Sequence, residues 1–341
     1  MAKYSKGEAR QWAFSSLRGC LGCVLPTFTP DLQGLNEAAI RHDIGLEKQN
    51  GMAGILLVSE CGTTRDEMIR FIEIAVDEAG ADLVTLVQAS EATIAQMIAV
   101  TQRAEELGVD MVLPSYPLYF HPRSHDDIFD LTKRLADSTS LGIMIFAIDQ
   151  WNFSRLHPAA FPRSLLERMV EELPTVVSIK NEIGGPGVGG IVQIFEAFNE
   201  RVVVTDPMEA NAPAWVRAYG MRVMGTSNYE SMADQVPRML SLLQSVDTFD
   251  QAMEIYWRMA PVRRANAAIM GPLIAQGSLV PRMFWKYQSW LVGYNGGPIR
   301  QPHARPNAAQ MATLRNAAVA AGLPVSSDDD EAFFAGRVSP Q

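Results

Sequence analysis

The chain has 341 residues, of which 48% are hydrophobic and 20% charged, a composition typical of a globular protein with a large core. Its net charge of −9 argues against nucleic acid or an anionic membrane as the main partner. No uninterrupted apolar run is long enough to span a bilayer, and the first residues lack the apolar stretch of a signal peptide, so we expect a cytoplasmic protein.

Short apolar runs typical of buried strands alternate along the chain with longer stretches typical of helices. Residues 1–20 predict a short helix before the first strand. That strand is expected over 22–28, with a helix around 35–50, and the last such pair is a strand over 222–228 with a helix over 229–245. The six pairs between them are predicted at 54–59 and 65–79, 83–89 and 91–107, 110–115 and 124–138, 142–148 and 163–173, 176–180 and 190–199, and 201–206 and 208–219.

This alternation predicts an α/β fold built on a parallel sheet with crossover helices. The expected strands are apolar on both faces, as a sheet covered by helices requires. Eight consecutive strand–helix units favour a closed (β/α)8 TIM barrel. An open doubly wound sheet is the alternative, but it usually has a glycine-rich first turn, whereas the first strand here ends in "LPTFTP".

The predicted organisation has four parts. An N-terminal extension covers residues 1–20, and the barrel covers 21–245. Residues 246–325 predict further helices packed on the barrel, and residues 326–341 form a polar tail that we expect to be mobile.

The chain has three cysteines, too few for a disulfide framework, which favours a reducing compartment. Cys20 and Cys23 form a CxxC pair that could act in redox chemistry or provide half of a metal site. No second CxxC and no nearby histidine pair completes a zinc site, so the sequence favours two small buried residues beside the first strand.

The stretch "VVSIKNE" places Lys180 at the end of the sixth predicted strand, and (β/α)8 enzymes have their active sites at the C-terminal ends of strands. Burial disfavours the charged form of an amine, and a neutral amine can attack a ketone to form an iminium, which acts as an electron sink. The structural alternative is an ion pair between Lys180 and Glu182 or another carboxylate at the barrel mouth. Position alone leaves both interpretations open.

From about Gly22 to Gly322 the chain resembles the dihydrodipicolinate synthase/N-acetylneuraminate lyase family of class I, pyruvate-type aldolases. The matching elements are "LPTFTP" after the first strand, "IKNE" at the sixth, "GTSN" at the eighth and "WLVGYNGGPIRQP" in the C-terminal region. The resemblance implies a (β/α)8 barrel with extra C-terminal helices, assembled as a homodimer or homotetramer. It also implies that Lys180 forms a Schiff base with pyruvate or another 2-oxo acid without any metal or organic cofactor. Gly225 and Ser227 of "GTSN" are implied as substrate contacts.

The fifth strand departs from this family. The family usually ends that strand with a Tyr-Asn-x-Pro element, whose tyrosine shuttles protons during iminium chemistry. Here the sequence is "IMIFAIDQWNF", so Phe146 takes the place of the tyrosine in the substrate site. A phenyl ring carries no transferable proton. Losing a positioned acid or base typically costs ~10²–10⁴-fold in rate. Tyr116, Asp149 and the side chains of residues 154–157 are candidate replacements.

The second strand is also unusual. The family's Gly-Thr-Thr-Gly-Glu element holds the substrate carboxylate, and by letters Gly62, Thr63 and Thr64 match it. By distance from the strand, residues 59–62 match instead, and Glu60 becomes a candidate acid or base. The alternative for Thr64 is structural, because "TRDE" is a capping box at the start of a helix.

After the fourth strand, "PSYPLYFHP" replaces the family's Pro-Tyr-Tyr element. Tyr116 best matches the second tyrosine, which in the synthase branch reaches into the site of a neighbouring subunit. Tyr119 and His121 are extra polar groups in a lengthened loop, where ordinary loop packing is the alternative. Asp206 follows the seventh strand, where relatives contact polar substrate groups. A metal site at such carboxylates has no supporting ligand spacing.

The sequence therefore predicts a lyase that forms a Schiff base through Lys180 with a small 2-oxo acid and then adds or releases an aldehyde or removes water. Two alternatives remain because Phe146 lacks the hydroxyl. One is a family member that keeps the lysine but has lost efficient aldol chemistry. The other is a barrel that binds small molecules without turnover.

Overall fold

The computed structural model describes residues 3–148, 151–182, 188–277 and 280–340. The chain divides into two compact units. The first unit consists of residues 1–19 and 84–226, and the second of residues 20–83 and 227–341. The domain boundaries predicted at residues 20, 245 and 325 stay predictions.

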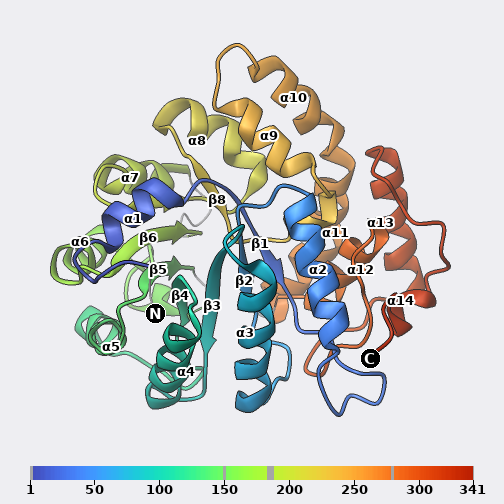
Figure 1. Ribbon diagram of the computed structural model, residues 1–341. Helices are drawn as coiled ribbons and strands as arrows, with labels where there is room; N and C mark the ends of the chain where they lie inside the picture. The colour runs from blue at the N-terminus through green and yellow to red at the C-terminus, as the bar shows by residue number, and fades with distance from the viewer. Residues whose placement is uncertain (1–2, 149–150, 183–187, 278–279, 341) are drawn as a thin grey trace. The chain divides into compact units, whose positions relative to one another are not determined.

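In the first unit the strands β3 to β7 are each followed by a helix, as the sequence predicts, and in Figure 1 the helices α4 to α7 lie along the outer side of the strands β3 to β6. Strands β3 to β7 are hydrogen-bonded in parallel in the order of the sequence. The described elements are α1 (Ala9–Ser16), β3 (Val84–Ser90), α4 (Ile94–Leu107), β4 (Met111–Ser115), α5 (His125–Ser138), β5 (Gly142–Ala147), η2 (Phe153–Arg155), α6 (Arg163–Glu172), β6 (Val176–Asn181), α7 (Val188–Phe198), β7 (Val203–Thr205), η3 (Glu209–Asn211), α8 (Ala212–Tyr219) and β8 (Val223–Gly225).

The strands of this unit are buried on both faces, which confirms what their apolar residues predicted. Every residue of β4 and of β6 is buried, so the side chains of these strands have protein on either side. The register pairs Phe146 of β5 with Lys180 of β6, and Lys180 with Thr205 of β7. Lys180 therefore lies between the ends of β5 and β7 in the sheet.

In the second unit β1 (Gly19–Val24) pairs in parallel with β2 (Gly54–Leu57), and Cys23 lies opposite Leu56. The helices predicted beyond residue 246 are present. Figure 1 shows α13 and α14 next to each other at the C-terminal end of the chain. The other elements are α2 (Glu37–Gln49), α3 (Arg65–Ala79), η4 (Tyr229–Met232), α9 (Gln235–Leu243), α10 (Phe249–Arg258), α11 (Ala260–Gly277), α12 (Arg282–Leu291), α13 (Ala308–Ala320) and α14 (Ala332–Ala335).

The C-terminal tail differs from the mobile segment that we expected. Phe333 of α14 is fully buried, and its ring packs against Trp290. The Asn295 carboxamide oxygen accepts hydrogen bonds from the backbone of Arg337 at 3.1 Å and of Val338 at 2.7 Å. Polar composition predicted solvation, but these long-range contacts anchor the tail within the second unit.

The three cysteines are free and buried. Burial raises the pKa of the Cys20 thiol well above its usual range, so the sulfur stays protonated. Cys20 and Cys23 lie within β1, which fits the interpretation of the CxxC pair as two small buried residues. No helix in the described part of the chain is long and apolar enough to cross a membrane.

Candidate active site

Lys180 is placed by a strand that the sequence strongly favours. Val176, Val177 and Ile179 are β-branched residues that suit a pleated, buried segment. The lysine is 5% exposed, and its Nζ lies 3.0 Å from Glu182 Oε1. The ion pair named as the alternative in the sequence is thus present, and it involves the residue two positions further on.

Phe146 covers the same amine from β5. Lys180 Nζ lies 3.9 Å from the centroid of the Phe146 ring, a cation–π contact. The Trp151 ring packs edge-on against Phe146, and its indole nitrogen donates to the Phe146 carbonyl at 3.0 Å. The phenyl ring is therefore held over the ammonium, where it contributes a polarisable face but no proton.

Asp206 follows β7 and binds the segment after it. One carboxylate oxygen accepts the backbone N–H of Met208 at 2.8 Å. The other accepts the side chains of Asn211 at 2.8 Å and Trp215 at 2.6 Å. Burial raises the pKa of Asp206, and the negative charge of Glu182 adds to this effect, so the two carboxylates lie within electrostatic range. Asp206 thus holds the start of α8 close to the C-terminal ends of β6 and β7.

Tyr116 follows β4, and its hydroxyl is engaged by helix α5. The phenol oxygen lies 2.7 Å from Thr132 Oγ1, and Thr132 in turn donates to the Ile128 carbonyl at 2.8 Å. Tyr116 must therefore be the donor of the pair. Its ring lies among Phe120, Trp151, Phe153 and Phe161, and burial raises its pKa.

The other candidate replacements for the missing tyrosine follow the fifth strand. Asp149 lies outside the described residues. Arg155 donates to the carbonyl of Pro122 in the β4–α5 loop. His157 Nδ1 accepts the backbone N–H of Ala159 at 3.1 Å. These two side chains therefore form hydrogen bonds with the backbone of loops in the first unit.

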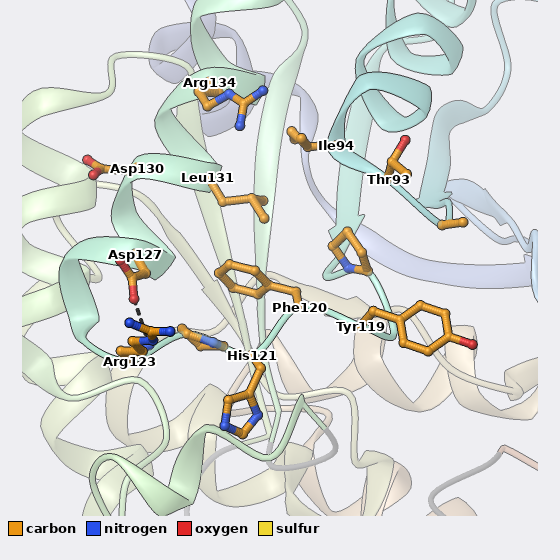
Figure 2. A pocket seen from close by; sticks show the side chains of 13 residues that line it. Thr93, Ile94, Tyr119, Phe120, His121, Arg123, Asp127, Asp130, Leu131 and Arg134 are labelled. Atoms are coloured by element: carbon orange, nitrogen blue, oxygen red, sulfur yellow. Dashed lines mark hydrogen bonds between the residues drawn. The ribbon is translucent and has the colours of Figure 1, made fainter.

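A surface cavity of about 590 Å³ lies beside the lengthened β4–α5 loop. Figure 2 shows Phe120 between Leu131 and His121, whereas Tyr119 extends away from the other lining side chains. The backbone N–H of Arg123 donates to Asp127 at 2.6 Å and ties the loop to the start of α5. Leu118 and Tyr119 are 94% and 91% exposed, so the tip of this loop is an apolar surface.

The "GTSN" element spans the end of β8. The backbone N–H of Gly225 donates to Thr205 Oγ1 at 3.2 Å, which joins β8 to β7 in the first unit. Thr226 is buried, and its hydroxyl has no partner among the described residues. Ser227 is half-buried in the second unit, where its carbonyl accepts from Tyr229 at 2.9 Å.

In the second unit, the three residues predicted to hold a carboxylate are tied to their own surroundings. Thr64 and Glu67 form the capping box of α3, as "TRDE" predicted. Thr63 Oγ1 donates to the Ser59 carbonyl at 3.3 Å. Gly62 has a φ of +73°, and its carbonyl accepts from Arg300 at 3.2 Å. Arg300 also forms two bonds to Glu67, of 2.6 and 2.7 Å.

Glu60 is paired with a cation from helix α12. Arg282 is 5% exposed, and its guanidinium donates to the Glu60 carboxylate at 2.8 Å. The His303 ring nitrogen Nε2 lies 2.7 Å from the Glu60 carbonyl. A buried arginine held by a carboxylate is costly to leave unpaired, so we interpret Glu60 first as the partner of Arg282.

A buried group of acids surrounds Lys286 of α12 in the second unit. Asp43 and Glu47 of α2, Glu230 of η4 and Tyr294 line a cavity of about 20 Å³ with it. Burial raises the pKa of Asp43 to about 6 and of Glu230 to about 8, and it lowers the pKa of Lys286 to about 8. Lys286 donates to Thr27 at 2.7 Å. The cluster could not be predicted from the sequence, because its members are widely separated in the chain.

Among the described residues, no group of three or more His, Cys, Asp or Glu side chains is arranged to hold a metal ion.

The comparison with family models decides the family. The model of the dihydrodipicolinate synthetase family matches residues 16–270. The chain belongs to the dihydrodipicolinate synthetase family. It is 22% identical over 295 residues to 4-hydroxy-tetrahydrodipicolinate synthase of Methanopyrus kandleri, covering 84% of this chain and 90% of that protein.

Solved structures confirm the fold class. N-acetylneuraminate lyase from Fusobacterium nucleatum matches with a TM-score of 0.72 and 15% identity, over 89% of this chain and 98% of that one. A prophage protein of the family from E. coli K12, in complex with pyruvate, matches with a TM-score of 0.74 and 16% identity, over 90% and 99% of the chains. The chain is therefore a (β/α)8 barrel with additional C-terminal helices, and its relatives in this family are lyases and synthases.

The contact between Lys180 and Glu182 was one of two interpretations that the sequence left open. Glu182 was considered only as an ion-pair partner. Side chains two apart on a strand point to the same face, so Lys180 and Glu182 were predictable neighbours if the strand continued. The missing phenol of Phe146 and a possible Lys180–Glu182 ion pair were both visible in the sequence, and the structure adds the 3.0 Å distance between Lys180 Nζ and the Glu182 carboxylate.

Proposed function

We propose that this protein is a Schiff-base-forming lyase that acts on pyruvate or another small 2-oxo acid through Lys180. The observation that carries the proposal is the placement of a nearly buried amine at the end of β6, in the "IKNE" element that matches the family's Schiff-base lysine. The iminium is itself the electron sink, so the reaction needs no metal or organic cofactor.

The carbon chemistry follows from the iminium. Once the 2-oxo acid is bound to Nζ, loss of a proton from its methyl carbon gives an enamine, which can add to an aldehyde. The reverse reaction releases an aldehyde, and an elimination removes water. We propose this class of reactions in the cytoplasm, by a homo-oligomer. Pyruvate is the natural first probe, because the related prophage protein is described with pyruvate bound.

The test is covalent trapping. The protein is incubated with pyruvate and sodium borohydride, and the adduct is located by peptide mass spectrometry. We expect the adduct on Lys180. Lys286 is the sharpest internal comparison, because it is also buried and burial lowers its pKa to about 8.

Lys180→Arg is the matched variant, since a guanidinium retains the positive charge opposite Glu182 but does not form an imine. It should fold and give no adduct. Wild-type protein that gives no adduct with pyruvate or with a panel of longer 2-oxo acids would contradict the proposal, as would an adduct on Lys286 that persists in Lys180→Arg.

A second candidate is favoured by Phe146: a family member that forms the iminium but carries out aldol chemistry poorly. The ring centroid lies 3.9 Å from Nζ, so a phenyl group occupies a position next to the reacting nitrogen. Trapped adduct without turnover across an aldehyde panel would select this candidate.

A further inference from the structure

The ion pair at Lys180 poses a chemical problem for the proposed function. An ammonium is not a nucleophile, and Lys180 Nζ forms an ion pair with the Glu182 carboxylate at 3.0 Å. The amine can attack a carbonyl only after the ammonium has given up a proton. A group within hydrogen-bond distance must accept that proton and must later protonate the oxygen that leaves as water.

The backbone holds Glu182 in place for this task. The N–H of Glu182 donates to the carbonyl of Ala147 at 2.9 Å, which extends the pairing of β6 with β5 by one residue beyond the strand. Alternation along this extended segment directs Ser178, Lys180 and Glu182 to one face. The Glu182 side chain is 16% exposed, so its carboxylate is sheltered from bulk water but not sealed from it.

The competing groups of the first unit are committed elsewhere. The Tyr116 hydroxyl donates to Thr132, and the Asp206 carboxylate accepts three donors of its own segment. Phe146 contacts Nζ but has no exchangeable proton. Among the described residues, the group that the geometry places in hydrogen-bond contact with Nζ is the Glu182 carboxylate.

We propose that Glu182 is the catalytic acid and base of iminium formation, in place of the phenol that the family resemblance leads one to expect at Phe146. This inference rests on the proposed function of Lys180. It concerns the residue that moves the protons and does not concern the identity of the 2-oxo acid.

The proton transfers balance as follows. Glu182 takes one proton from the Lys180 ammonium, and the neutral amine attacks the carbonyl carbon while the carbonyl oxygen takes the proton back from Glu182. The resulting carbinolamine nitrogen gives a second proton to Glu182. Glu182 then protonates the hydroxyl, which leaves as water while the nitrogen lone pair forms the C=N bond. Ammonium and ketone thus become iminium and water, and Glu182 ends as a carboxylate.

The experiment measures the rate of adduct formation with pyruvate by rapid mixing, borohydride quenching and intact-protein mass spectrometry. Glu182→Gln keeps the shape of the side chain but does not accept the proton, and we expect a rate ~10²–10⁴-fold lower. Glu182→Asp should recover most of the rate. Glu167→Gln is the matched control, since it removes an exposed carboxylate that pairs with Arg163 on α6, and it should react like wild type.

Chemical rescue separates catalysis from structural support. In Glu182→Ala, added formate should restore the rate in a concentration-dependent way, because a small carboxylate can occupy the vacated volume and transfer the protons. The same formate should leave Glu182→Gln unchanged, since the amide fills that volume. Circular dichroism and thermal unfolding establish that each variant is folded.

The outcomes distinguish this inference from the proposed function. If wild type and Glu182→Gln form adduct at the same rate, Glu182 is not the proton-transfer residue, although the function of Lys180 stands. The inference is also overturned if Glu182→Asp is as slow as Glu182→Gln and formate has no effect on Glu182→Ala. If wild type gives no adduct with any 2-oxo acid, the proposed function itself fails.

Discussion

Lys180 and Phe146 face each other across the β5–β6 ladder, with Nζ 3.9 Å from the centroid of the phenyl ring. The sheet register fixes the two Cα positions, and the cation–π contact follows from it. A tyrosine at position 146 would therefore carry a phenol beside the amine that we propose forms the iminium.

Phe146→Tyr should not lower, and we expect it to raise, the exchange of the methyl protons of pyruvate into deuterated solvent. The added phenol would supply a second proton carrier next to the amine, without removing the ring contact. Nuclear magnetic resonance of the pyruvate methyl signal measures this rate. Slower exchange in the variant would mean that the phenyl ring has a packing or catalytic purpose of its own.

Glu230→Gln should flatten the dependence of stability on pH between pH 6 and 8. The pKa of Glu230 in the folded protein is about 8, against an ordinary value of 4.5, so the native state binds more protons than the unfolded chain in this interval. The free energy of unfolding of the wild type therefore falls as the pH rises from 6 to 8. Glutamine keeps an acceptor for the Cys23 N–H, which donates to Glu230 at 2.5 Å, but carries no titrating proton.

Urea unfolding at pH 6 and pH 8 tests this prediction. The neighbouring groups are Asp43, Glu47, Arg282, Lys286 and Tyr294. The lowered pKa of Lys286, about 8, acts in the opposite direction and above this interval, because its native state binds fewer protons than the unfolded chain between about 8 and 10.5. A slope in Glu230→Gln as steep as in the wild type would contradict the assignment.

Gly62→Ala should lower the free energy of unfolding by ~1–3 kcal/mol, because a non-glycine residue is strained at a φ of +73°. A Cβ there would also meet the Gln301 carbonyl oxygen at 2.7 Å and Arg300 Cβ at 2.8 Å. Gly45→Ala is the matched control, since a Cβ at this position of helix α2 meets nothing within 4 Å, and it should be neutral or stabilising by ~0.5–1 kcal/mol. Chemical denaturation of both variants gives the comparison, and equal stabilities would refute the backbone argument.

Replacing Leu118 and Tyr119 together by serine should weaken subunit association. An exposed apolar pair at the tip of a loop is typical of a contact surface, and these residues are 94% and 91% exposed. Sedimentation should find wild type as a dimer or tetramer and the double variant as a smaller species. Val246→Ser, at a residue that is 68% exposed, is the control and should leave the assembly intact. A wild type that is monomeric, or a double variant that assembles normally, would count against the prediction.

Local signals predicted the elements well. The run Val176 to Lys180 reads as a buried strand and is one, with Asn181 added. The letters "TRDE" predicted the capping box at Thr64, which needs contacts only three residues apart. Helices and strands follow from such short-range patterns, so the strand–helix order and the fold class could be predicted from the sequence.

Charge pairs between distant parts of the chain could not be predicted in the same way. Arg282 and Glu60 are separated by 222 positions, and their partnership depends on how α12 packs in the second unit. Lys286 of α12 likewise has acidic neighbours that come from α2 and η4, far from it in the chain. Glu182 could be named from the sequence as a possible partner of Lys180. Its position beside the amine could not be predicted, because it depends on the pairing of β6 with β5 continuing past Asn181.

The contacts of Arg300 limit how far the chain can be truncated at its C-terminal end. Its guanidinium donates to the Leu32 carbonyl at 2.7 Å and to the Gly62 carbonyl at 3.2 Å, and it grips Glu67 with two bonds. A gene shortened to encode only residues 21–245 would leave two carbonyls and a carboxylate of the N-terminal half without their donor. The segment between α12 and α13 that carries Arg300 is thus tied to the start of α3, and a shortened form of the protein must retain this segment.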